Sequence, residues 1–154
     1  MIRKLGVIAV FIGIVSIVIG AIFISQSIEK NDWITNAMRQ EKVTLGLSDE
    51  QIASGDVIDN TQEAQAAADM IREHRRGIAP TYNDLLADSG GKFDPTNPQD
   101  LDYAQALNME NYLYLAVLSF GVIQEIMATG AALIIIGLAL GGIGIAMYQQ
   151  AKTQ

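Results

Sequence analysis

The sequence predicts an all-α fold, a membrane protein in which two transmembrane helices form a long antiparallel hairpin and carry a small helical extracytoplasmic domain. Two apolar runs support this prediction, residues 5–25 and 126–148, and neither contains a charged side chain. At about 1.5 Å per residue, each run forms a helix of roughly 30 Å, the thickness of a bilayer's hydrocarbon core. Between the runs, apolar positions recur at helical spacing, which predicts further helices.

Composition divides the chain into three segments. Residues 1–25 are predicted to form the N-terminal transmembrane helix, residues 26–111 an acidic helical extracytoplasmic domain, and residues 112–150 a C-terminal helix that includes the span 126–148. The middle segment holds 16 of the 17 acidic residues and 7 of the 10 basic ones, a net charge of −9. Such a surface repels polyanions, so we expect no nucleic acid among the partners.

Basic residues at the ends of the chain predict its orientation. Arg3 and Lys4 precede the first apolar run, and Lys152 follows the second. The positive-inside rule therefore places both termini in the cytoplasm of a two-span protein of the cell membrane. The first run is 21 residues long, beyond the roughly 7–15 of a cleavable signal peptide, and favours an anchor. Cleavage near residues 25–27 is the alternative.

Two cap signals predict the helices of the middle segment. Asn60, with Glu63 three positions later, opens a helix that runs through Arg76 and stops at Gly77. Thr81 opens a short second helix, which ends at the glycine pair 90–91. Residues 46–59 are predicted to be a loop, because they are rich in turn-forming residues.

The last helix has a strong start signal and no early stop. Asn97 is a good N-cap and Pro98 suits the first helical position, so one helix is expected from about Pro98 to about Gln150. It holds more apolar residues than a bilayer needs. We therefore predict that the first helix continues past residue 25 and that the two pack beyond the membrane as a stalk, through Trp33, Met38, Tyr112 and Phe120.

Small residues recur in both spans and predict helix–helix packing. The candidate positions are Gly13, Gly20, Gly137, Gly141 and Gly144. These strips either serve contact between the two spans of one chain or contact with other subunits. Further glycines at Gly130 and Gly142 fall on other sides of the second span by this reasoning. These additional glycines predict contact with other subunits, in a homo-oligomer or a membrane complex. The lipid bilayer is the other predicted partner.

Polar residues near the second span are candidate functional groups. Gln124 and Glu125 come directly before it, so they are expected at the outer interface, where a carboxylate reaches water. Pairing of Glu125 with Lys30 or Arg39 is one alternative, and a proton or cation role is another.

Neither metal nor nucleophilic chemistry has a clear signature. The chain lacks cysteine, and its one histidine, His74, has no cluster of ligands around it. An oxygen-rich turn near residue 97 leaves calcium as an alternative to ordinary capping, although the EF-hand spacing is missing; its members are Asp94, Asn97, Asp100 and Asp102. We predict no catalytic residue, no metal site and no cofactor.

Three stretches carry a resemblance to a known family: QEKVTL (40–45), AQAAADMIREH (64–74) and LAVLSFGV (115–122). The chain resembles a family of uncharacterised bacterial small membrane proteins with two spans, which are often automatically labelled aromatic ring-opening dioxygenases. The resemblance implies two spans around a helical extracytoplasmic region. The label conflicts with the chemistry, because such enzymes hold iron with two histidines and a carboxylate, and this chain has one histidine.

The sequence therefore predicts a non-catalytic integral membrane protein, an accessory or self-assembling subunit of a membrane complex. The alternative is an extracytoplasmic sensor or ligand-binding module. Short cytoplasmic tails leave little room for a signalling output, which favours the first function.

Overall fold

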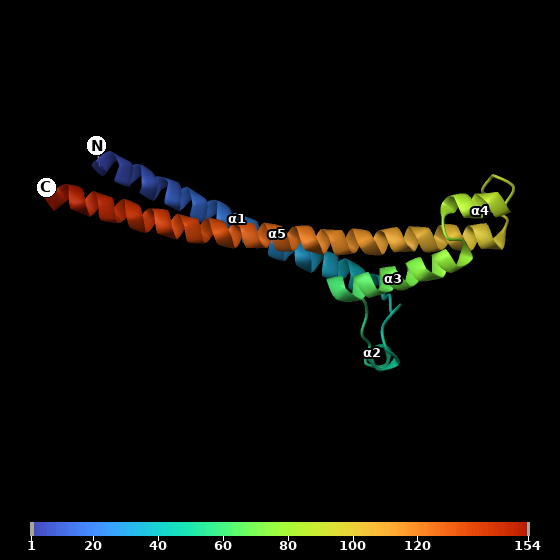
Figure 1. The fold of residues 1–154 in the computed structure, drawn as a ribbon. Helices are drawn as coiled ribbons and strands as arrows, with labels where there is room; N and C mark the ends of the chain where they lie inside the picture. The colour runs from blue at the N-terminus through green and yellow to red at the C-terminus, as the bar shows by residue number, and fades with distance from the viewer. Residues whose placement is uncertain (1, 154) are drawn as a thin grey trace. The chain divides into compact units, whose positions relative to one another are not determined.

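The computed structural model describes residues 2–153 and is all-helical over that range, with 83% of residues in helices and no strand (Figure 1). The predicted all-α class is confirmed. Five helices follow in order: α1 (Ile2–Glu41), α2 (Asp49–Ala53), α3 (Thr61–Ile78), α4 (Tyr82–Asp88) and α5 (Pro98–Thr153).

The chain forms two compact units. One contains the residues up to Asp32 together with those from Val122 onward, and the other contains Trp33–Gly121. The long helices α1 and α5 therefore contribute to both units. Composition alone placed the boundaries at 25/26 and 112, where the apolar runs give way to polar sequence. We call the first unit the paired-helix unit and the second the helical domain.

In the paired-helix unit, two helices are long and apolar enough to cross a membrane. Both leave most of their apolar surface uncovered by protein. In their most apolar stretches, only 11% of the residues of α1 and 17% of those of α5 are buried. The core helix of a soluble protein has most of its apolar side chains covered, and these two segments do not.

The helical domain contains one helix that was not predicted. The loop expected over residues 46–59 includes α2, whose N-cap Ser48 accepts a hydrogen bond from the Gln51 N–H while the Gln51 side chain accepts one from the Ser48 N–H. This reciprocal pair is a capping box. Its signal is present in the sequence as Ser-x-x-Gln, but no apolar run follows it to draw attention to a helix.

The predicted cap at Asn60 is present, and the predicted stop at Gly77 is wrong. Asn60 accepts hydrogen bonds from two backbone N–H groups at the start of α3, whereas the Glu63 side chain accepts from the Asp59 N–H. The helix ends at Ile78, one residue past the glycine. Pro80 lacks an N–H and disfavours helical backbone in the residue before it, which accounts for an end beyond Gly77.

The start of α5 is fixed by a buried carboxylate. Asp100 is fully buried and accepts hydrogen bonds from the Ser89 hydroxyl, the Asp94 backbone N–H and the Asn97 amide. Thr96 donates to the Asp94 carboxylate through its backbone N–H and its hydroxyl, which lowers the pKa of Asp94. Capping thus occupies these oxygens in the turn considered as a calcium site.

Two apolar clusters hold the helical domain together. The larger has Ile58, three alanines of α3 and Leu113 of α5 at its centre, with Met38 of α1 among the side chains packed against it. Alanine lets α3 approach α5 closely, because it adds no more than a methyl group to the contact. The smaller cluster joins α4 to the start of α5 through Ala79, Leu85 and Tyr103.

Candidate functional site

Glycines form the contact between α1 and α5 in the paired-helix unit. A methyl group added to Gly13 would lie 2.6 Å from the carbonyl oxygen of Gly137, and one added to Gly20 would lie 2.5 Å from that of Gly130. In a third glycine pair, a methyl group added to Gly6 would lie 2.8 Å from the carbonyl oxygen of Gly144. The glycines are seven residues apart on each helix, and their numbers rise along α1 as those of their partners fall along α5. The helices are therefore antiparallel, with a heptad contact that we call the glycine seam.

The seam explains why glycine is required. At these distances no real side-chain carbon fits between the backbones. The bare Cα of each glycine instead faces a carbonyl oxygen of the other helix, the arrangement in which weak Cα–H···O contacts form. Close approach of this kind is how helices associate where apolar burial provides no driving force, as in lipid.

The structure brings together most of the predicted packing glycines, and it corrects one assignment. Gly13, Gly20, Gly137 and Gly144 belong to the seam, and the backbone of Gly141 lies beside Gly13. Gly130 does not face away from the first span as expected; it packs against Gly20. A spacing of seven residues relates Gly6, Gly13 and Gly20 on α1 to Gly130, Gly137 and Gly144 on α5, and it adds Gly6 to the predicted positions.

One step of seven residues beyond Gly20 and Gly130, the same register pairs two residues that are not glycine. Continuing the same pairing places Ser27 opposite Ile123, and both are buried, at 3% and 7% exposure. The Ser27 hydroxyl has no hydrogen-bond partner among the described residues. A buried hydroxyl without a partner destabilises a fold by about 1–3 kcal/mol.

We expect the Ser27→Ala variant to be more stable than the wild type by about 1 kcal/mol, because it removes that hydroxyl and keeps the small volume. The measurement is the unfolding midpoint of the purified protein in mild detergent. Ser25→Ala, at an exposed position two residues earlier, serves as the control and should leave the midpoint unchanged. A drop in the midpoint of Ser27→Ala would show that the hydroxyl does find a partner.

Basic and aromatic side chains meet at one end of the paired helices. Arg3 donates a hydrogen bond of 3.2 Å to the Tyr148 hydroxyl, and its guanidinium lies 5.2 Å from the centre of that ring. The Lys152 ammonium lies 5.1 Å from the same ring. A tyrosine with two cations at the end of an apolar helix pair is typical of a membrane–water interface.

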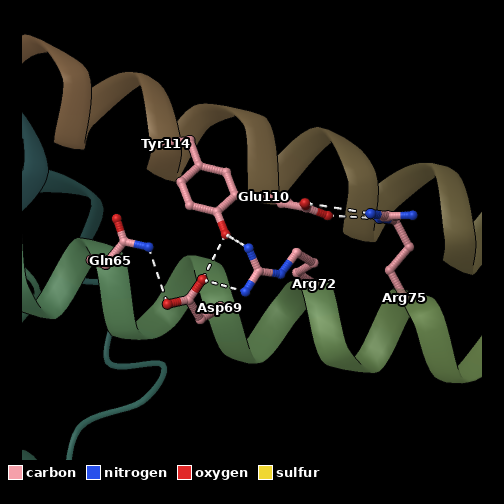
Figure 2. Close-up of polar contacts among 6 residues, drawn as sticks. All are labelled: Gln65, Asp69, Arg72, Arg75, Glu110 and Tyr114. Atoms are coloured by element: carbon pink, nitrogen blue, oxygen red, sulfur yellow. Dashed lines mark hydrogen bonds and ion pairs between the residues drawn. The ribbon is translucent and has the colours of Figure 1, made fainter.

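In the helical domain, a buried ion pair joins α3 to α5. The Arg75 guanidinium contacts both oxygens of Glu110, at 2.6 and 3.4 Å, and donates to the Tyr103 hydroxyl at 2.7 Å. Both charged side chains are about one-tenth exposed. The hydrogen bond to Glu110 raises the pKa of Arg75, against the opposing effect of burial. Figure 2 shows the pair between the two helices.

A second polar group lies beside this pair. The Tyr114 hydroxyl of α5 donates to Asp69 at 2.6 Å and accepts from Arg72 at 2.7 Å, and Gln65 also donates to Asp69 (Figure 2). The bond from Tyr114 lowers the pKa of the Asp69 carboxyl, and the same bond raises the pKa of Tyr114. Each of these groups has a partner on its own helix or on the facing one, so the arrangement links α3 to α5.

The predicted stalk contact is wrong at two of its four residues. Trp33 is 67% exposed and Tyr112 is 65% exposed, whereas Phe120 is buried and Met38 packs against the larger cluster. The reason is a rotation by one residue. The heptad from Gly6 to Ser27 continues to Ile34 rather than to Trp33, and on α5 the buried residue is Leu113 rather than Tyr112.

The polar residues near the second span are exposed. Gln124 and Glu125 both lie on the surface of α5. Arg39, one of the two alternative partners of Glu125, forms an ion pair of 2.6 Å with Asp59. The His74 ring lies 3.4 Å from Asp102, and both side chains are more than half exposed. Within residues 2–153, no group of three or more histidine, cysteine or acidic side chains could hold a metal ion.

An apolar groove opens on the helical domain between the end of α1 and the middle of α5. Its volume is about 200 Å³, and Glu41 is its one charged side chain. The remaining lining residues are Met38, Val43, Ile58, Met109, Tyr112, Leu113 and Ala116.

Comparison with known proteins adds no relative to these observations. The resemblance to two-span bacterial membrane proteins stays a prediction. No protein family, curated protein or solved structure matches this chain.

Proposed function

We propose that this protein is a non-catalytic integral membrane protein, an accessory or self-assembling subunit that crosses the cell membrane as an antiparallel helical hairpin. The observation that carries the proposal is the glycine seam between two helices whose remaining apolar surface is uncovered. A soluble protein would leave that surface in water at a large free-energy penalty, whereas lipid covers it.

The register of the seam supports a consistent position in the bilayer. The uncharged run 5–25 of α1 lies opposite residues 125–145 of α5, which are uncharged except for Glu125 at one end. On this register Glu125 lies level with Ser25, at the edge of the hydrocarbon layer, where its carboxylate reaches water. At the other end, Arg3, Lys4 and Lys152 match a cytoplasmic surface. The acidic residues 26–111 are then extracytoplasmic.

The polar chemistry of the helical domain supports a structural role. Two of its buried charged groups, Arg75 and Glu110, neutralise each other, and Arg75 also donates a hydrogen bond to the Tyr103 hydroxyl. A general acid or base must instead be able to reach a substrate. The domain therefore uses its ionisable groups to hold α3 against α5, as expected for a module that presents a surface to a partner.

Cysteine labelling tests the proposal without background, because the chain contains no cysteine. We expect an impermeant thiol reagent to label Ser54→Cys in intact cells, and to label Lys152→Cys only after the membrane is opened. Both residues are exposed on the protein surface, so a difference in their labelling reports on the membrane rather than on burial within the protein. Labelling of both in intact cells, or recovery of the protein without detergent, would contradict the two-span arrangement.

A second function has one observation in its favour. The apolar groove beside Met38 and Met109 has room for a small apolar molecule and would suit an extracytoplasmic sensor or ligand-binding module. Binding of a small fluorescent apolar probe to the wild type, abolished by Met109→Trp, would favour this function over the first.

A further inference from the structure

Three of the four most exposed large apolar residues of the helical domain lie on one helix, α5. Of the large apolar residues in Trp33–Gly121, four are more than half exposed, and three of these lie within seven residues of α5: Tyr112 at 65%, Leu115 at 55% and Leu118 at 61%. They share one side of the helix with Ser119. We call these four residues the α5 stripe.

The stripe is also free of charge, although the domain around it is strongly acidic. Residues 33–121 carry fourteen acidic and six basic side chains, a net charge of −8. Between Asp102 and Glu125, however, the only charged residue of α5 is Glu110, which is buried against Arg75. Two acidic domains repel each other, so the uncharged stripe is where they can approach most closely.

Lipid does not account for the stripe. On the proposed position in the bilayer, Glu125 marks the outer edge of the hydrocarbon layer. Ten residues of helix, about 15 Å, separate Glu125 from Leu115, and the headgroup layer is only roughly 5–8 Å thick. Leu115 and Tyr112 therefore need a protein cover.

We propose that a second copy of this chain provides that cover, and that the two copies pack stripe against stripe. This inference rests on the proposed function, which gives all copies the same orientation in the membrane. Two α5 helices then run parallel, and a two-fold axis brings the same face of each into contact. The residues at 112, 115 and 119 have the 3,4 spacing that parallel paired helices use.

Ser119 suits a close contact between two helices. It is small, and its hydroxyl donates a 2.7 Å hydrogen bond to the Leu115 carbonyl oxygen of its own helix. Its polar group is therefore satisfied before a partner arrives, and burying it leaves no donor unpaired. The tyrosine and the two leucines that precede Ser119 in the stripe provide the area that anchors an interface.

The test uses the full-length protein in native membranes and in nanodiscs. Under mild oxidation, Leu115→Cys and Ser119→Cys should form disulfide-linked dimers, because residues near a two-fold axis come within disulfide range. Met70→Cys on α3 is the matched control, since Met70 is apolar and 48% exposed but lies outside the stripe. In mass measurements, the wild type should be a dimer. Leu115→Glu should weaken dimerisation about tenfold or more, and Met70→Glu should not.

The outcomes separate this inference from the function beneath it. If the wild type assembles but cross-links equally well through Met70→Cys and is unaffected by Leu115→Glu, the stripe is not the interface and the subunit function stands. Cross-linking of the stripe to a different protein overturns the second copy as occupant. A wild type that is monomeric in nanodiscs, without partners, overturns both proposals.

Discussion

Replacing Gly13 with leucine is expected to break the contact between α1 and α5 while leaving Gly142→Leu harmless. At Gly13, even a methyl group would lie 2.6 Å from the Gly137 carbonyl oxygen and 2.9 Å from the Gly141 nitrogen. These are backbone atoms, so no rotamer change can make room and the helices must separate. We expect a loss of at least about 3 kcal/mol, the upper part of the range for overpacking.

The two glycines form a matched pair. Nothing lies within 4 Å of a methyl group added to Gly142, which is exposed on the same apolar stretch of α5. Both substitutions add one leucine to a long apolar helix and remove one glycine. The measurement is the concentration of SDS that unfolds each variant in mixed micelles, followed by circular dichroism. Equal midpoints for the two variants would mean that the seam does not hold the helices together.

The helices were largely predictable because their signals are local. Asn60, Thr81 and Pro98 mark helix starts through bonds or ring geometry that involve the next three residues only. The length of α5 follows from an unbroken run without a helix terminator. The helix α2 was missed although Ser48 and Gln51 form a complete capping box, because five residues bury too little to leave a periodic pattern.

The contacting faces were less predictable, because one residue of error rotates a helix by about 100°. Trp33 and Tyr112 are large and aromatic, which made them attractive as stalk residues. Their neighbours are less exposed: Ile34 is half-buried and Leu113 is buried. The sequence does contain a signal for the inward face of each helix. Glycine recurs every seven residues on α1, at Gly6, Gly13 and Gly20, and at the same spacing on α5.

The polar network needed a register that the sequence did not provide. Arg75 and Glu110 are 35 residues apart, and no local rule pairs them. A partial signal exists: Arg75 falls four residues after Ile71 on the apolar face of α3, and Glu110 falls three before Leu113 on the inner face of α5. One opposite charge in the apolar face of each of two helices indicates a buried pair.

Removing one partner of that pair is expected to destabilise the helical domain strongly. Arg75→Met leaves the Glu110 carboxylate, 6% exposed, without its counter-ion and without its two hydrogen bonds from Arg75. We expect a loss of about 3 kcal/mol, at the lower end for a buried pair because both side chains keep some contact with water. The measurement is chemical unfolding of the full-length protein in mild detergent, followed by circular dichroism.

Two further variants show whether the loss comes from an unpaired buried charge. Arg39→Met removes an ion pair of the same 2.6 Å length, but Arg39 is 58% exposed, so the expected loss is below about 1 kcal/mol. The double variant Arg75→Met, Glu110→Leu removes both charges and replaces them with apolar side chains. It should recover most of the stability, since an apolar pair of similar volume often equals a buried ion pair. If the double variant is as unstable as Arg75→Met alone, the Tyr103 and packing contacts of Arg75, rather than its charge, hold α3 against α5.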